Sequence, residues 1–386
     1  MKLRHGIQGR WLALALGTAA LAPLNANAAT VFGSSGGLIW EATSNLVAMT
    51  STGIVASGGN AAFLAPRAQY NGVVSLIMTY SGGQFLCSGS LLSDRVSVVT
   101  AGHCVSDGAG TANPLLTQAF FSNSPDLDAV NHLDLASEVR TVSRYEVNEG
   151  YTGEIIDQND IAILRLSQAA PEWAISYDFD FATDLDGQNF NVAGYGRRSN
   201  TGGSVGANLS AGRLRQGDNS YDYALGDSQF GGFFTDRDMS GEGFFGFANY
   251  SNSIVSDFDS GLAANDVSCR FASALGADAG FGCHLGVGAR EVGVAGGDSG
   301  GPQFINGKIT SITSYGLSFG TKFGDCRAGL NSSCGEFSGY VPVSIHKDFI
   351  NSAMSVPEPG TWALMIGGFG LAGGMLRRRK LAATAA

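Results

Sequence analysis

The feature that most constrains the fold of this chain is the order of three short segments that carry a histidine, an aspartate and a serine. They are Thr-Ala-Gly-His-Cys at 100–104, Asp-Ile-Ala-Ile-Leu at 160–164 and Gly-Asp-Ser-Gly-Gly-Pro at 297–302. A serine hydroxyl is a poor nucleophile at neutral pH unless a base lies within hydrogen-bonding reach and a third group orients that base. The segments supply one residue for each role, so we expect a fold that brings His103, Asp160 and Ser299 together.

These segments resemble those of the trypsin/chymotrypsin family of serine endopeptidases, in which the triad follows the same chain order. The resemblance covers roughly Val73 to Ile350. It implies an all-β fold of two antiparallel six-stranded β-barrels of the chymotrypsin type with a short C-terminal helix. The cleft would lie between the barrels, with His103 as base, Asp160 as the carboxylate that orients it and Ser299 as nucleophile. The backbone N–H groups of Gly297 and Ser299 would form the oxyanion hole.

The composition agrees with a β-rich fold. The chain has 56 Gly among 386 residues, only 9 Pro and only 15% charged residues, which is typical of short strands joined by many turns. A helix is expected at 346–354. Strands are expected at 73–78, from 85 onward, and at 95–100, 161–166, 189–196, 309–314 and 340–344.

The resemblance also indicates where a substrate would bind. Gly293, six residues before the serine, matches the floor of the primary pocket, which is acidic in members that cut after Lys or Arg. Ser314, Tyr315 and Gly316 match the segment that binds substrate backbone as an added strand. An uncharged floor favours an apolar or small substrate side chain, although Asp325 is a charged residue that could reach the pocket.

Activation is the point at which the sequence departs from the family pattern. In the family, the residue at Asp298 pairs with a new N-terminal amine after a propeptide is cut. The nearest apolar pair upstream is Ile54-Val55, and no basic cleavage site precedes it. Asp298 is therefore expected to find another partner.

The chain contains six cysteines, and an even count in an exported chain predicts three disulfides. The resemblance implies the pairs Cys87–Cys104 and Cys269–Cys283 and, with them, Cys326–Cys334. A zinc site is the alternative, but no CxxC spacing occurs, and only His103 and His284 lie beside a cysteine.

Both ends of the chain read as targeting signals. Residues 1–28 combine a basic start, an apolar run and Ala26-Asn27-Ala28, which predicts a secretory signal removed by signal peptidase. Residues 354–386 contain Val-Pro-Glu-Pro-Gly, an apolar stretch at 361–376 and a basic cluster at 377–380. This layout resembles the PEP-CTERM sorting signal of Gram-negative bacteria, which an exosortase cleaves. It implies a transmembrane sorting helix with transient or lasting membrane contact; an ordinary single-pass anchor is the alternative.

Between these ends, residues 29–67 read as an N-terminal or pro-segment and 68–353 as the protease domain. Residues 199–267 are rich in Gly, Ser, Asn and Asp and read as a loop-rich insertion, either a substrate-shaping exosite or a packed elaboration without a binding role. Acidic residues at Asp126, Asp128 and Asp134 and at Asp184 and Asp186 lack the full ligand pattern of a calcium loop, so no metal site and no cofactor is expected.

Charge limits the partners. Without residues 1–28 and 357–386 the chain carries 16 basic and 32 acidic residues, a net charge of −16, which argues against nucleic acid. We expect an exported monomer of the cell envelope or extracellular space that hydrolyses proteins or peptides. The alternatives are a catalytically inactive, protease-like binding or adhesion protein of the envelope or matrix, and an esterase that uses the same triad.

Overall fold

The computed structural model describes residues 30–35, 37–43, 46–48, 61–108 and 113–355. The predicted signal peptide, the Ile54-Val55 pair and the sorting signal lie outside these residues. Within the described part, no helix is both long and apolar enough to cross a membrane.

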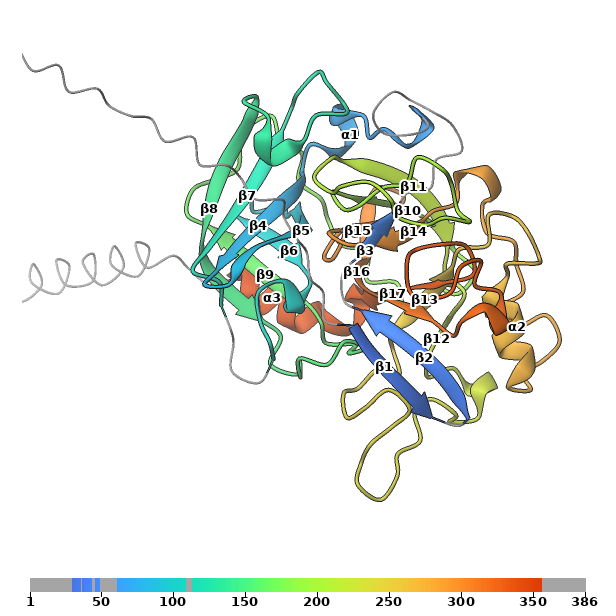
Figure 1. The fold of residues 1–386 in the computed structure, drawn as a ribbon. Coiled ribbons are helices and arrows are strands. Elements are labelled where there is room, and N and C mark those ends of the chain that lie inside the picture. Colours follow the sequence, from blue (N-terminus) through green and yellow to red (C-terminus); the bar gives the residue numbers. More distant parts are fainter. Residues whose placement is uncertain (1–29, 36, 44–45, 49–60, 109–112, 356–386) are drawn as a thin grey trace, which may run out of the picture.

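The first half of the described chain from residue 61 onward is a closed antiparallel barrel with the strand order β4-β5-β6-β9-β8-β7 (Figure 1). This confirms the first predicted six-stranded barrel. Its interior is filled by aliphatic side chains that alternate along the strands, such as Val74, Leu76 and Met78. The strands are β4 (Val73–Tyr80), β5 (Gly83–Leu91), β6 (Ser97–Thr100), β7 (Leu116–Ser122), β8 (Ser137–Val147) and β9 (Ala162–Leu166).

The second half differs from the predicted six-stranded barrel. It is a nine-stranded antiparallel sheet with the path β11-β10-β15-β16-β17-β13-β12, and an N-terminal hairpin, β1 with β2, adds to β16. The path is open between β11 and β12. These two strands are consecutive in the chain and are separated only by Tyr221 and Asp222. The strands are β1 (Thr30–Ser35), β2 (Leu38–Thr43), β10 (Asn189–Gly194), β11 (Arg215–Ser220), β12 (Tyr223–Ala224), β13 (Ile254–Asp257), β15 (Pro302–Ile305), β16 (Lys308–Ser318) and β17 (Phe337–Pro342).

A separate two-stranded sheet pairs β3 (Leu46–Ala48) with β14 (Gly293–Ala295). The short helices are α1 (Arg67–Tyr70), α2 (Val267–Ala274) and α3 (Lys347–Ser355), of which α3 confirms the predicted C-terminal helix. The 3-10 turns are η1 (Ala61–Phe63), η2 (Gly102–Cys104), η3 (Asn131–Leu133), η4 (Ser228–Phe230), η5 (Gly288–Arg290), η6 (Thr321–Phe323) and η7 (Val343–His346).

A shared hydrophobic core joins the two halves. It combines Ile77 and Leu86 of the first barrel with Tyr195 and Ile312 of the second sheet. Tyr195 is fully buried, and its hydroxyl donates to the carbonyl oxygen of Val73 at 3.1 Å. The two halves are therefore fixed against each other at the place where the histidine and serine segments meet.

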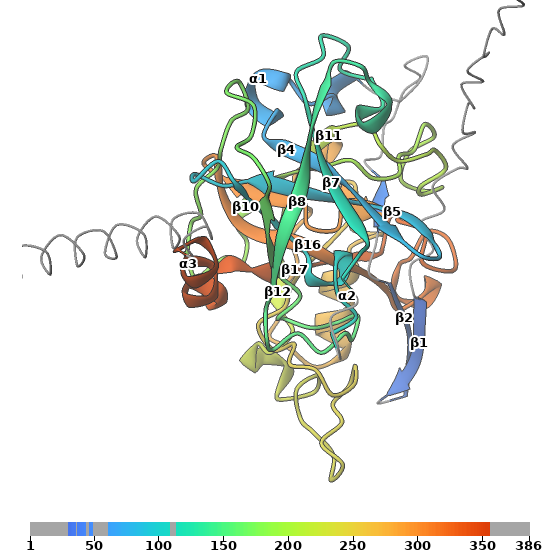
Figure 2. The same ribbon diagram turned by 90° about the vertical axis from the view of Figure 1, so that its left-hand side faces the viewer.

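Residues 199–267 are not simply a loop-rich insertion, because they contain β11, β12 and β13. The rest of the segment packs an aromatic core in which Phe234 stacks on Phe245 and Phe271, with ring centroids 5.7 and 5.6 Å apart. Although the segment is rich in polar residues, the burial of several aromatic rings stabilises it. In both views the yellow loop between β12 and β13 and the β1–β2 hairpin lie toward the lower end of the molecule (Figures 1 and 2).

Candidate active site

His103 lies on η2, directly after β6, in the turn that leads out of the barrel core. Its Nδ1 atom is 2.7 Å from Oδ2 of Asp160, and its backbone N–H donates to Oδ1 of the same carboxylate at 2.7 Å. The Cys87–Cys104 disulfide ties the end of η2 to β5. The ring of His103 is thus fixed by the contact of Nδ1, and its backbone is fixed by the hydrogen bond to Asp160 and by the disulfide of the neighbouring Cys104.

Asp160 precedes β9 and is 1% exposed. Besides the two bonds from His103, its Oδ2 accepts a hydrogen bond from Oγ of Ser314 at 2.6 Å. Ser314 belongs to β16 of the other half, so the carboxylate is held from both sides of the cleft. The sequence predicted that the 314–316 segment binds substrate through its backbone, which stays a prediction; the hydrogen bond from the Ser314 side chain to the buried acid is a second role that the sequence did not predict.

Ser299 lies in the tight turn between β14 and β15. Its carbonyl oxygen accepts a hydrogen bond from the backbone N–H of Ser88 at 2.9 Å and lies 3.7 Å from Sγ of Cys104. Gly300 has φ +78°, and a Cβ there would lie 2.1 Å from Oγ1 of Thr100 and 2.6 Å from the backbone nitrogen of Ala101. Only glycine allows the serine turn to approach the histidine turn so closely.

The structure therefore places the serine turn against the strand and turn that carry His103. Nε2 of His103 and Oγ of Ser299 are both buried, and neither has a hydrogen-bond partner among the residues that the structure describes, so the two atoms do not hydrogen-bond each other. Two polar atoms without partners are costly in a protein interior, which is typical of groups kept ready for a substrate.

Ser88 is a positioning residue that the sequence did not reveal. It lies on β5 and is fully buried. Its Oγ donates to the carbonyl oxygen of Gly297 at 2.8 Å and accepts from the backbone N–H of Tyr195 at 3.0 Å. One hydroxyl thus joins the serine turn to the Gly-Tyr-Gly turn at 194–196. Nothing in the local sequence around 88 distinguishes it from other strand serines.

The predicted oxyanion residues have the expected backbone freedom. Gly297 has φ +115°, and a Cβ there would lie 2.7 Å from Leu86. In the described part of the chain, the N–H groups of Gly297 and Ser299 donate no hydrogen bond to another residue. They are available to a ligand, as an oxyanion hole requires.

Asp298 is fully buried, and its Oδ1 accepts a hydrogen bond from the backbone N–H of Gly196 at 3.1 Å. Burial raises the pKa of this carboxyl to about 7, and the Gly196 hydrogen bond offsets that rise in part. The partner expected for Asp298 is therefore a backbone amide. Gly194 allows the approach, because a Cβ there would lie 1.8 Å from Oδ1 of Asp298.

The residues predicted around the primary pocket lie on two strands. Gly293 begins β14, and Gly316 lies on β16. Tyr315 is buried, and its hydroxyl hydrogen-bonds Oγ of Ser253 at 2.8 Å, so its side chain is held in the core of the second half. Asp325 uses one carboxylate oxygen to accept from Ser318 Oγ and the other to accept from the Arg327 N–H.

The three expected disulfides are present at Cys87–Cys104, Cys269–Cys283 and Cys326–Cys334, and the described residues contain no free cysteine. The zinc alternative is therefore excluded for these six residues.

Asp128, one of the acidic residues considered for calcium, forms ion pairs with Arg213 at 3.4 Å and Arg198 at 3.8 Å, and with Arg215.

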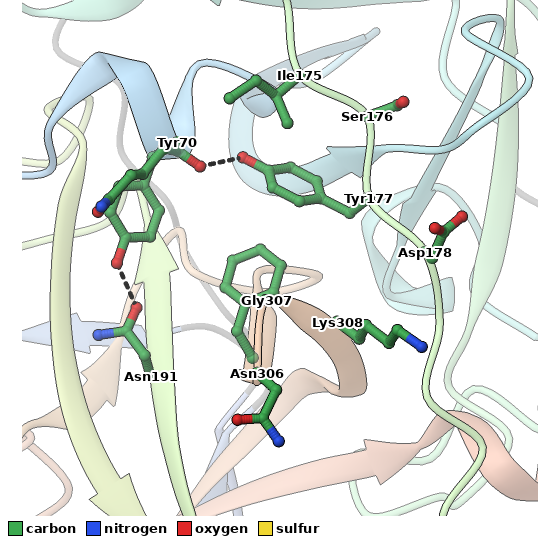
Figure 3. A pocket seen from close by; sticks show the side chains of 11 residues that line it. Tyr70, Ile175, Ser176, Tyr177, Asp178, Asn191, Asn306, Gly307 and Lys308 are labelled. Carbon is green, nitrogen blue, oxygen red and sulfur yellow. Dashed lines mark hydrogen bonds between the residues drawn. The ribbon is translucent and has the colours of Figure 1, made fainter.

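A separate cleft of about 500 Å³ opens beside α1 and contains none of the three predicted catalytic residues (Figure 3). Two tyrosines on its wall are fixed by hydrogen bonds, Tyr70 to Asn191 and Tyr177 to the carbonyl oxygen of Gln69. Its lining offers no pair of nucleophile and base.

The comparisons with known proteins agree with this geometry. The family model described as Trypsin matches residues 65–222. This part of the chain is similar to the trypsin family. A second family model, the PEP-CTERM protein-sorting motif, matches residues 355–380. No curated protein matches the sequence.

The trypsin-like domain indicates a serine peptidase that acts on protein substrates. The PEP-CTERM motif indicates export, a Gram-negative cell envelope and processing by an exosortase. The match to the trypsin model ends at residue 222, before the segment that contains Ser299, so the nucleophile rests on the sequence motif and on the geometry of its turn.

Proposed function

We propose that this protein is an exported serine endopeptidase that uses His103, Asp160 and Ser299 as its catalytic triad. The observation that carries the proposal is the pair of 2.7 Å contacts between Asp160 and His103, with the Ser299 turn fixed against the adjoining η2 and β5. A buried carboxylate, an imidazole and a serine in a glycine-bounded turn are the arrangement that acyl transfer requires.

In the proposed reaction, Ser299 Oγ attacks the substrate carbonyl while Nε2 of His103 accepts its proton. Asp160 keeps Nδ1 protonated and stabilises the imidazolium. The N–H groups of Gly297 and Ser299 bind the negative oxygen of the tetrahedral intermediate, and one such donor contributes about 10²–10³ in rate. His103 then gives the proton to the leaving amine, and water hydrolyses the acyl-enzyme by the reverse sequence.

We propose an apolar or small side chain at the residue before the cleaved bond. The floor residue Gly293 carries no charge, and a Cβ there would meet Phe258 at 3.4 Å. Asp325 does not supply the missing charge, since both its carboxylate oxygens are engaged within the 318–333 loop.

Substitution of the nucleophile tests the proposal. Ser299→Ala is expected to reduce peptide hydrolysis by at least about 10⁴-fold with the fold retained, since the triad acts as a unit. Ser176→Ala, in the cleft of Figure 3, is the matched serine control and is expected to keep full activity. Hydrolysis of peptides and simple esters should be measured side by side. Ester turnover without peptide turnover supports the esterase reading, and wild-type protein inert to both supports a binding module.

A further inference from the structure

The N-terminal hairpin lies on the strand that the resemblance assigns to the substrate. β2 pairs antiparallel with the end of β16, with Thr43 opposite Gly316, Ala42 opposite Leu317 and Glu41 opposite Ser318. A peptide that adds as a strand to a sheet edge receives its affinity from such main-chain bonds. The chain therefore occupies the edge of β16 from Gly316 onward.

The same segment continues along the strand that precedes the catalytic serine. β3 pairs antiparallel with β14, with Leu46 opposite Ala295 and Ala48 opposite Gly293. Gly293 is the predicted pocket floor, and β14 leads directly into the turn that holds Ser299. β2 thus pairs with the predicted backbone-binding strand, and β3 pairs with the strand that carries the predicted pocket floor.

Side chains of β2 anchor this segment. Trp40 is 7% exposed and packs edge-on against Phe245, with ring centroids 5.1 Å apart. Ala42 is fully buried, whereas Ile39, the neighbour of Trp40, is 75% exposed. Oε2 of Glu41 accepts a hydrogen bond from the backbone N–H of Leu330 at 3.2 Å. One face of the strand is therefore buried, and its aromatic contact comes from the 199–267 segment.

We infer that β2 (residues 38–43) and β3 (residues 46–48) occupy the substrate groove of the protease domain as an intramolecular inhibitor, with Trp40 seated in a subsite formed by Phe245 and its neighbours. The inference rests on the proposed function. Substrates of this site would be extended peptides with an aromatic side chain further toward the N-terminus than the residue directly before the cleaved bond. Because the occupant is tethered, its effective concentration is about millimolar, and a free substrate must displace it.

The test compares Trp40→Ala with Ile39→Ala in the full chain. Trp40→Ala is expected to raise kcat/KM for peptide hydrolysis at least about tenfold, because it weakens the occupant and leaves the triad intact. Ile39→Ala is the matched control and is expected to leave kcat/KM unchanged. Equal kcat/KM in both variants and the wild type, or a fall in Trp40→Ala alone, overturns the inference.

A second measurement does not depend on catalysis. A fluorescent peptide with the sequence of residues 38–48 is titrated into the double variants Trp40→Ala/Ser299→Ala and Ile39→Ala/Ser299→Ala. Tighter binding to the first supports the inference, and absence of binding to both at millimolar peptide overturns it. If the peptide binds but no variant hydrolyses any substrate, the proposed function fails while the groove assignment stands.

A different observation carries a second inference. Asp257 at the end of β13, Asp259 two residues later and Glu291 just before β14 each place one carboxylate oxygen within 4.8 Å of the others. Their exposed fractions are 2%, 0% and 3%. Sequence reasoning missed this group because Glu291 is far along the chain from the other two.

Hydrogen bonds compensate this cluster only in part. Oδ2 of Asp257 accepts from Ser268, and Oδ1 of Asp259 accepts from the backbone N–H of Gly261. Among the described residues, Oδ2 of Asp259 and both carboxylate oxygens of Glu291 are buried without a hydrogen-bond partner. The charged neighbours that act on the Glu291 carboxyl are Asp259 and Asp222, both acidic, and His284 is paired with Asp222 at 3.0 Å. Buried charge of one sign is expensive unless it is neutralised by protons or by a cation.

The geometry points to a divalent cation site formed by Asp257, Asp259 and Glu291, with Ca²⁺ as the ion whose chemistry fits. Calcium binds carboxylate oxygens at 2.3–2.6 Å, so two ligand oxygens of one ion lie at most about 5 Å apart, and the separations in this group are below that limit. The ion would tie β13 to the residue that leads into β14, and so fix the floor of the primary pocket at Gly293.

The test measures thermal unfolding of the full chain in Ca²⁺ and in EDTA. Ca²⁺ is expected to raise the Tm of the wild type by at least about 3 °C and that of Glu291→Gln by less than about 1 °C. Asp186→Asn, in the exposed acidic loop, is the matched control and should respond as the wild type does. Equal Tm values of the wild type in Ca²⁺ and EDTA, together with no heat of Ca²⁺ binding by calorimetry, overturn the site in favour of protonated carboxyls.

Discussion

Replacing Asp160 by asparagine tests how the triad is oriented. Oδ1 of Asp160 accepts the backbone N–H of His103 and must remain an oxygen in the variant. The new NH₂ group therefore takes the place of Oδ2, where it faces Nδ1 of His103. Nδ1 must then accept a hydrogen bond, so the ring carries its proton on Nε2 and cannot accept one from Ser299.

The loss of the correct tautomer is expected to reduce kcat by about 10⁴, which corresponds to about 5.5 kcal/mol of transition-state stabilisation. KM should change little, because the side chain of Asp160 contacts no substrate. Ser314→Ala is the graded comparison. It removes one hydrogen bond to the carboxylate, worth about 1.5–3 kcal/mol, and should cost between about 10- and 100-fold.

The assay is steady-state hydrolysis of a peptide with an apolar residue before the cleaved bond, with the Tm of each variant recorded to confirm folding. An Asp160→Asn variant that keeps its fold and more than a tenth of wild-type kcat would refute the reasoning. So would a Ser314→Ala variant as damaged as Asp160→Asn.

Three further predictions concern other parts of the site. The pKa of Asp298 is about 7 in the folded state against 3.8 in the unfolded state, so between these pH values the folded state holds a proton that the unfolded state has lost. The contribution of Asp298 to the free energy of unfolding therefore falls as pH rises from about 4 to 7. Asp298→Asn should reduce the difference in the free energy of unfolding between pH 5 and pH 8 by about 2–3 kcal/mol in urea titrations. A peptide library should show cleavage after apolar or small residues, and equal or faster cleavage after Arg contradicts the role given to Gly293. Ser88→Ala should lower kcat by about tenfold with KM unchanged, because it frees the Gly297 carbonyl and the serine turn; an unchanged kcat refutes that positioning role.

Much of the site was predictable because its determinants are local. His103, Asp160 and Ser299 lie in short segments whose residue types state their roles, and the structure brings the first two into direct contact. The first barrel was predictable because the resemblance implied it and because strands such as Val73–Tyr80 are short apolar runs, with Val74, Leu76 and Met78 in the barrel core and Val73 and Ile77 in the core between the two halves. The disulfides followed from the resemblance.

The second half was harder to predict because some of its buried strands are built from polar residues. β11 reads Arg-Gln-Gly-Asp-Asn-Ser, yet Arg215 and Asn219 in it are buried. They are satisfied by distant groups, Arg215 by Asp128 and Asn219 by the carbonyl oxygens of Asp257 and Val292. Such pairings depend on tertiary contacts that no local pattern contains.

The N-terminal segment and α2 illustrate the same limit. β2 is only six residues long, and its place on β16 depends on Trp40 reaching Phe245. α2 carries a recognisable start, since the Asp266 side chain accepts from the N–H of Cys269 at 2.8 Å, but its surroundings are rich in turn residues. Ser88 has no local signal, and the hydrogen bond from Ser314 to Asp160 has none either, because both contacts arise only where the two halves meet.

The most direct measurement of the central claim is covalent labelling by a fluorophosphonate probe, mapped by mass spectrometry of the modified peptide. The probe reacts with a serine activated by a neighbouring base, and it should modify Ser299 in the wild type, faster in Trp40→Ala, and not in His103→Ala or Ser299→Ala. Failure to label Ser299 in folded wild type and folded Trp40→Ala, or labelling at another serine, would contradict the assignment of the triad.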